Sequence, residues 1–136
     1  MNNLEAYKMD GLGNDFIIFD KRKRSISLSK DEIIKISNRN NIGCDQVIFI
    51  DEDKNSNTLV KFYNSDGEET SACGNGTRCI AYLLMKEKNK KKILLKTKAG
   101  ILEAELNDND LVTVNMGKPN FEWNKIPLLK KWITKI

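Results

Sequence analysis

A cysteine set among small residues is the feature of this chain best suited to chemistry. Residues 71–79 read SACGNGTRC and place Cys73 directly before Gly74, Asn75 and Gly76. We expect a helix to begin here, so that the backbone N–H groups after Cys73 lack helical partners and the helix dipole adds partial positive charge. Such a position favours a thiolate, and the glycines let an anionic ligand approach the backbone. Cys73 is therefore a candidate acid/base.

The three cysteines admit different interpretations. Taken alone, Cys73 is explained equally well as a small buried hydrophobe at a helix start. Cys79 would lie about 9 Å farther along the same helix and about 120° around it, and should point into the core. Cys44 is expected to serve packing. Because three is an odd number, free thiols are favoured over a disulfide framework.

Composition restricts the chemistry further. The chain has 136 residues, no histidine, 40% hydrophobic residues, 31% charged residues and a formal net charge of +4. This length suits one domain with a real core, and without histidine neither a Ser–His nor a Cys–His pair can form. The cysteine spacing is not that of zinc ligands, so no metal is expected. No apolar stretch is long enough to span a membrane, and the N-terminus lacks a signal-peptide pattern, so a cytoplasmic protein is expected.

The hydrophobic pattern predicts an α+β domain. A capping box formed by Ser29 and Glu32 begins a helix that should reach about Asn40. A longer helix should run from Asn75 to about Lys88, apolar enough to be wrapped by a sheet. About seven strands are predicted, at residues 6–9, 16–20, 47–50, 59–63, 93–97, 101–106 and 111–115.

Four polar, glycine-bearing turns lie next to these elements. They read GLGNDF at residues 11–16, GCDQ at 43–46, NSDGEE at 64–69 and ACGNGTRC at 72–79. Their order and spacing resemble the diaminopimelate epimerase family, and the likeness runs from Lys8 to Leu128. The paired-cysteine proline racemase group is less similar, because its cysteine motif differs.

The resemblance implies a fold and a mechanism. The family has two similar lobes, each a mixed β-sheet wrapped around a central helix, and interconverts LL- and meso-diaminopimelate, a lysine and peptidoglycan precursor, without a cofactor. One cysteine from each lobe takes or returns the proton, and Cys73 matches the first of them. The family's substrate-binding positions correspond here to Asn14, Gln46, Asn64, Gly74 and Asn75. Side-chain amides suit a zwitterionic amino acid, because they donate to carboxylates and accept from ammonium groups.

Structural explanations stand beside these functional ones. Asn14 follows two glycines and could occupy a left-handed turn position. Asn64 could simply begin a type I turn, and Gln46 could lie on an exposed strand edge. The acidic residues 66–69 fit a solvated hairpin tip better than a cation site. The basic run 86–92 lacks the interleaved aromatic residues of a nucleic-acid surface, so no nucleic-acid partner is expected.

Two departures from the family pattern affect the function. Asp10 stands where the family usually has a histidine before its first glycine. The chain also ends near the lobe junction, so residues 1–118 would form the N-terminal lobe and 119–136 an inter-lobe segment or truncated tail. A basic amphipathic pattern in residues 126–136 could alternatively contact a membrane surface or a partner.

Two functional hypotheses follow. In the first, the chain is an epimerase lobe that completes its site with a second lobe in trans or in a homodimer. In the second, it is a catalytically incomplete remnant or an amino-acid-binding module that lacks the second cysteine.

Overall fold

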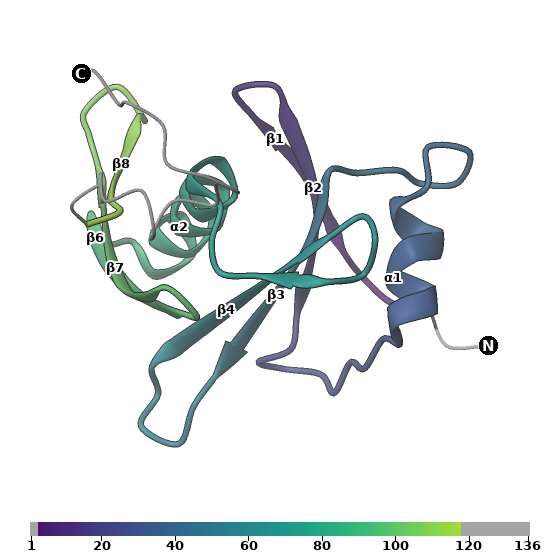
Figure 1. Cartoon of the computed structure of the whole chain (residues 1–136). Helices are drawn as coiled ribbons and strands as arrows, with labels where there is room; N and C mark the ends of the chain where they lie inside the picture. The colour runs from purple at the N-terminus through teal and green to yellow at the C-terminus, as the bar shows by residue number, and fades with distance from the viewer. Residues whose placement is uncertain (1–2, 118–136) are drawn as a thin grey trace, which may run out of the picture.

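A curled sheet of eight strands and two helices make up residues 3–117, the part of the chain that the computed structural model describes (Figure 1). The sheet order is β1-β2-β3-β4-β6-β7-β8, with β5 paired to β4. The pairs β2–β3 and β4–β6 are parallel and the others antiparallel. The strands are β1 (Tyr7–Gly11), β2 (Asn14–Asp20), β3 (Gln46–Glu52), β4 (Thr58–Asn64), β5 (Glu69–Thr70), β6 (Lys92–Thr97), β7 (Gly100–Leu106) and β8 (Val112–Asn115). The helices are α1 (Lys30–Ser37) and α2 (Gly74–Lys88).

The sheet curls around α2, as the hydrophobic pattern predicts. In Figure 1, α2 lies between the β1–β2 edge of the sheet and its β6–β8 end, and it contacts strands of both. Alternate residues of the central strands point toward this helix, because side chains along a strand alternate between faces. The largest buried cluster joins Phe16, Ile18, Ile48, Ile50, Val60 and Phe62 of the sheet to Ile80, Leu84 and Met85 of α2.

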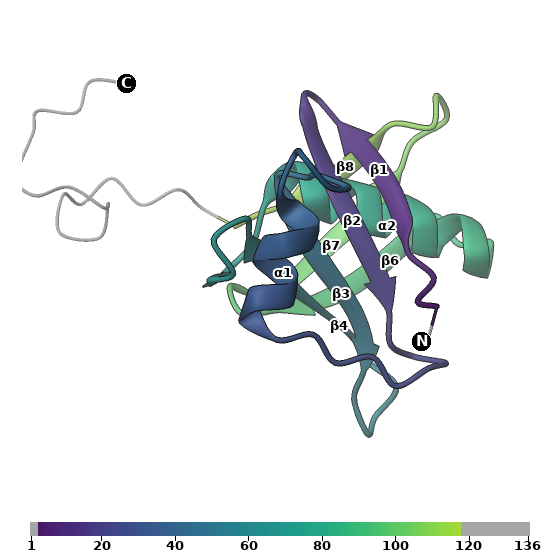
Figure 2. The same cartoon turned by 90° about the vertical axis from the view of Figure 1, so that its right-hand side faces the viewer.

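Helix α1 covers the opposite face of the sheet (Figure 2). Its buried residue Ile33 joins a second cluster with Ile17, Phe19, Val47 and Phe49, which are the intervening residues of β2 and β3. Both faces of these two strands are therefore buried, which explains their nearly continuous apolar sequences. A central layer of sheet thus separates a core on α2 from a smaller one under α1.

Helix α1 starts as the sequence predicts, but it ends earlier. The capping box is confirmed: the Glu32 backbone N–H donates to Ser29 Oγ at 3.2 Å, and the Ser29 N–H donates to Glu32 Oε2 at 2.7 Å. The predicted end near Asn40 is wrong, because the helix stops at Ser37. The returning chain provides the reason, since Gly43 N–H donates to Ile36 O at 2.9 Å and satisfies a carbonyl that another turn of helix would have used.

The remaining predictions of secondary structure are largely confirmed. All seven predicted strands are present, and the α2 boundary agrees within one residue. The two-residue strand β5 was not predicted, because a pair of residues shows no alternation. The predicted segment 119–136 lies outside the described residues. Neither helix among residues 3–117 has the length and apolarity required to cross a bilayer.

Candidate active site

Three neighbouring strands become polar at the same end of the sheet. Gln46 pairs with Phe16 of β2 and with Asn64 of β4, and Asn14 lies two residues before Phe16. Asn14, Gln46 and Asn64 each extend a row of side chains that faces α2, because each lies two residues from a buried member of that row. The three predicted amides therefore lie at the end of the apolar core, on the side of the sheet that carries α2.

Helix α2 begins directly above this end of the sheet. A Cβ atom at Gly76 would lie 3.1 Å from Ile48 Cδ1, 3.1 Å from Phe62 Cε1 and 3.3 Å from Phe16 Cε1. Phe16, Ile48 and Phe62 are the neighbours of the three amides in the rows of side chains that face α2. The missing side chain of Gly76 thus allows the first turn of the helix to lie close against the sheet, beside the polar ends of the strands.

Cys73 occupies the N-cap position of α2, as predicted. Its backbone is extended, with φ −130° and ψ 124°, and its side chain makes no capping hydrogen bond. Its carbonyl oxygen instead accepts from Thr77 N–H at 2.8 Å and from Thr77 Oγ1 at 2.7 Å, which anchors the first turn. The half-buried thiol is consequently not used to hold the helix, and it lies beside the positive end of the helix dipole.

The predicted amides form two hydrogen-bonded pairs. Asn75 Nδ2 donates to Asn14 Oδ1 at 2.7 Å, and Gln46 Nε2 donates to Asn64 Oδ1 at 2.9 Å. The side-chain oxygen of Gln46, Oε1, is buried and has no hydrogen-bond partner among residues 3–117. A buried acceptor without a partner is destabilising, so this oxygen is the least satisfied atom of the amide cluster.

The structure tests the structural explanations that the sequence offers for these amides. The left-handed interpretation of Asn14 is wrong, because the positive φ angles of this turn belong to Leu12 and Gly13. The exposed-edge interpretation of Gln46 is also wrong, because β3 lies between β2 and β4 and the residue is half-buried. Asn64 does begin a turn, since its carbonyl accepts from Gly67 N–H at 2.9 Å, while its side chain still accepts from Gln46.

Asn14 is hydrogen-bonded to an ion-pair cluster that the sequence did not predict. Asp15 accepts from Arg39 Nη1 at 2.6 Å and Nη2 at 2.8 Å and from Lys8 Nζ at 2.8 Å. Hydrogen bonds from Arg39 hold the pKa of Asp15 well below its usual range, although partial burial opposes this shift, and the same pairing raises the pKa of Arg39. Asp45 accepts from Arg39 Nη2 at 3.0 Å and from Asn14 Nδ2 at 3.2 Å. The only sequence signal was position, since Asp15 and Asp45 adjoin the predicted amides.

The other two cysteines are buried, as predicted. Cys79 is 6% exposed and Cys44 is 2% exposed. Burial raises the pKa of both thiols, and the charge of Asp10 contributes further to the shift at Cys79. Both are thus disfavoured as thiolates at neutral pH. Among the described residues, no group of cysteine and carboxylate side chains could hold a metal ion.

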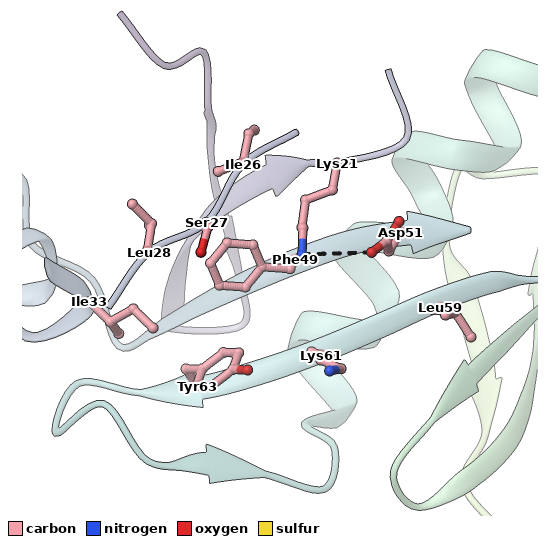
Figure 3. A pocket seen from close by; sticks show the side chains of 10 residues that line it. All are labelled: Lys21, Ile26, Ser27, Leu28, Ile33, Phe49, Asp51, Leu59, Lys61 and Tyr63. Atoms are coloured by element: carbon pink, nitrogen blue, oxygen red, sulfur yellow. Dashed lines mark ion pairs between the residues drawn. The ribbon is translucent and has the colours of Figure 1, made fainter. Parts of the chain in front are cut away.

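A separate cavity of about 250 Å³ lies on the α1 face of the sheet. Figure 3 shows its Phe49 and Tyr63 rings and the ion pair between Lys21 Nζ and Asp51 Oδ2, which are 3.7 Å apart. None of its ten lining residues is a candidate site residue. The half-buried polar cluster at the start of α2 is therefore distinct from this cavity.

Solved structures with similar folds define the class of protein. A PhzC/PhzF protein from Clostridium difficile matches with a TM-score of 0.60 and 28% identity, over 79% of this chain and 42% of that one. A hydroxyproline epimerase from Agrobacterium vitis matches with a TM-score of 0.55 over 82% of this chain and 40% of that one, and at 13% identity this likeness concerns the fold alone. The curled sheet around α2 is thus one lobe of the diaminopimelate epimerase-like fold.

Sequence relatives identify the family within this class. Residues 6–122 match the family model of diaminopimelate epimerase. The diaminopimelate epimerase of Pelagibacter ubique is 50% identical over 133 residues, which are 98% of this chain and 48% of that protein. The corresponding protein of Caulobacter sp. is 45% identical over 136 aligned residues, 93% of this chain and 47% of that protein. The chain belongs to the diaminopimelate epimerase family, and it spans about half the length of these curated relatives.

Proposed function

We propose that this chain forms the lobe of a diaminopimelate epimerase that supplies Cys73 as the thiol acid/base. The observation that carries the proposal is the cluster of two amide pairs, Asn75–Asn14 and Gln46–Asn64, beside the N-cap Cys73 at the start of α2. In a chain of this family, four amides and an N-cap cysteine form a coherent site for a zwitterionic amino acid.

Each group has a task that its chemistry suits. The N–H groups of the first turn of α2, beginning at Gly74 and Asn75, suit the substrate carboxylate, because a helix N-terminus favours an anion. Gln46 suits the substrate ammonium group if its side chain turns Oε1 toward the ligand, since this oxygen accepts a hydrogen bond and adds no charge. Asn14 and Asn64 complete a neutral polar lining. This arrangement would hold the Cα–H bond beside Cys73.

The proton transfer needs Cys73 as a thiolate on one face of Cα. The thiolate accepts the Cα proton, the Cα–H bond breaks, and its electron pair remains on the substrate as a carbanion that the carboxylate stabilises. Inversion requires a second acid to deliver a proton to the opposite face. Cys44 and Cys79 are 2% and 6% exposed, so neither is suited to this task. The second acid would come from a complementary lobe or from a second copy of the chain.

A binding module without turnover is the second candidate function. It is favoured by the same burial of Cys44 and Cys79, since among residues 3–117 Cys73 is the single thiol with partial access to solvent. In this case the amide site would hold the amino acid and Cys73 would not exchange its proton. The two functions differ only in whether the substrate loses its Cα hydrogen.

Proton NMR of diaminopimelate in deuterium oxide distinguishes them. We expect the reduced chain to broaden the ligand resonances and to cause loss of the Cα–H signal, and we expect Cys73→Ala to abolish the loss but retain the broadening. Cys44→Ala is the matched control, because it removes a buried thiol and should leave exchange unchanged. Broadening without exchange in the unaltered chain would favour the binding module, and the absence of both effects would contradict the proposed site.

A further inference from the structure

The amides of Asn14 and Asn75 belong to a longer chain of hydrogen bonds. Asn14 Nδ2 donates to Asp45 Oδ2 at 3.2 Å, while Asn14 Oδ1 accepts from Asn75 Nδ2 at 2.7 Å. At the other end, Asn75 Oδ1 accepts from Arg78 Nη2. The four side chains come from β2, from the residue before β3 and from the first turns of α2. Hydrogen bonds therefore connect the sheet to the start of α2, directly beside Cys73.

The two ends of this chain have opposite chemistry. An ionised carboxylate such as Asp45 only accepts hydrogen bonds, and a guanidinium such as Arg78 only donates them. An asparagine amide has an oxygen and a nitrogen of nearly equal size, and without such neighbours it can occupy either of two flipped orientations. Between an obligate acceptor and an obligate donor, only one orientation of each amide gives three hydrogen bonds.

Asp45 is itself held firmly. Its Oδ1 accepts from Arg39 Nη2 at 3.0 Å, and its Oδ2 accepts from the Asp15 backbone N–H at 3.1 Å. Its own backbone N–H donates to Asp15 Oδ1 at 3.0 Å, which makes the contact between the two residues reciprocal. The Asp45 carboxylate is thus fixed by groups from two segments, the Arg39 side chain and the Asp15 backbone, in addition to its contact with Asn14.

From this geometry we infer that Asp45 is a positioning residue. Together with Arg78, it sets the polarity of the Asn14–Asn75 pair, by which we mean the direction in which the hydrogen bonds are donated. Arg78 donates to Asn75, Asn75 donates to Asn14, and Asn14 donates to Asp45. Each amide nitrogen then keeps one N–H for a ligand acceptor such as a carboxylate oxygen. The inference rests on the proposed function only in assigning that acceptor to an amino-acid substrate.

Asp45→Asn is the variant that tests the polarity. It keeps the size of the side chain, but an amide can donate as well as accept, so the end of the chain is no longer an obligate acceptor. In the heteronuclear NMR spectrum of the ligand-free chain, we expect the side-chain NH2 signals of both Asn14 and Asn75 to shift or double. Asn14→Ser and Asn75→Ser assign those signals. Asp51→Asn, which removes a carboxylate paired with Lys21 on the opposite face of the sheet, is the matched control and should leave them unchanged.

A measurement of ligand affinity tests whether the orientation of the two amides matters for binding. If the amides position a substrate, Asp45→Asn should weaken diaminopimelate binding about tenfold, equivalent to about 1.4 kcal/mol, and Asp51→Asn should not. The backbone spectrum and the thermal midpoint must show that Asp45→Asn is folded, and Asp45→Glu, which restores an obligate acceptor, should recover part of the affinity.

The outcomes separate this inference from the proposed function. Unchanged Asn75 signals in a folded Asp45→Asn chain would overturn the polarity, and shifted signals with unaltered affinity would overturn the positioning role. If the unaltered chain binds no diaminopimelate, the proposed function fails. The ligand-free spectrum then still supports or overturns the orientation of the two amides.

Discussion

Gln46 of β3 pairs with Asn64 of β4, and their side chains share one hydrogen bond. Gln46 Nε2 donates to Asn64 Oδ1 at 2.9 Å, whereas the buried Gln46 Oε1 has no hydrogen-bond partner within the described part of the chain. An unsatisfied buried acceptor destabilises a fold by about 1–3 kcal/mol. The ligand-free chain therefore carries a local destabilisation at the polar end of β3 and β4.

Gln46→Met separates stability from binding. Methionine has a similar volume and removes the unsatisfied acceptor, but it also removes the hydrogen bond from Nε2 to Asn64. Because these two effects oppose each other, the free energy of unfolding should remain within about 1 kcal/mol of the original value. Affinity for diaminopimelate should fall by about tenfold or more. Urea unfolding and ligand titration measure the two effects. Lys61→Met, at an exposed position on β4, is the control and should leave affinity unchanged. Destabilisation of the Gln46→Met chain well beyond the about 1.5 kcal/mol of one lost hydrogen bond would show that Oε1 has a stabilising partner.

Gly76→Ala tests the close approach of α2 to the sheet. The new Cβ would lie 3.1 Å from both Ile48 Cδ1 and Phe62 Cε1, so overpacking should destabilise the chain by about 1–3 kcal/mol, despite the better helix propensity of alanine. Gly74→Ala provides the control, because its Cβ would meet only Arg78 Nη1 at 3.9 Å. Thermal unfolding compares the two variants. Equal thermal midpoints for the two variants would mean that the start of α2 moves to accommodate a Cβ atom at Gly76, contrary to its close packing against the sheet.

The sequence predicted the positions of the candidate residues in the fold better than it predicted their hydrogen-bond partners. The glycine-bearing turns placed Asn14, Gln46 and Asn64 at strand ends, and strand alternation then orients all three toward α2. The ion pairs could not be predicted in this way, because Arg39 reaches Asp15 over 24 residues and no local period links them. The end of α1 was missed for a similar reason, since the hydrogen bond from Gly43 to Ile36 depends on the path of a loop.

Asp15→Asn should alter the dependence of stability on acid pH. Hydrogen bonds from Arg39 lower the pKa of Asp15 below its usual value near pH 4. A carboxylate with a lowered folded-state pKa stabilises the fold above its unfolded pKa, and this contribution is lost as the pH falls through the folded pKa. At pH 7 the variant should therefore be less stable by about 1 kcal/mol, after allowance for solvent screening.

The difference between Asp15→Asn and the unaltered chain should shrink as the pH falls below about 4. Urea unfolding at a series of pH values measures it. Asp108→Asn is the control, because that side chain is 99% exposed and should show no comparable difference. A difference that stays constant down to strongly acid pH would show that the Asp15 charge does not stabilise the fold.

Cys73 should be the first cysteine to react with iodoacetamide in the native chain. Its side chain is half-buried at the start of α2, whereas Cys44 and Cys79 are 2% and 6% exposed and burial raises the pKa of both. Since the thiolate is the reactive form, we expect Cys73 to be alkylated more than about tenfold faster than the other two, as measured by mass spectrometry of peptides. Unfolding in urea should abolish the difference, which serves as the control. Comparable native rates for all three thiols would contradict the burial of Cys44 and Cys79 that leaves Cys73 as the accessible thiol.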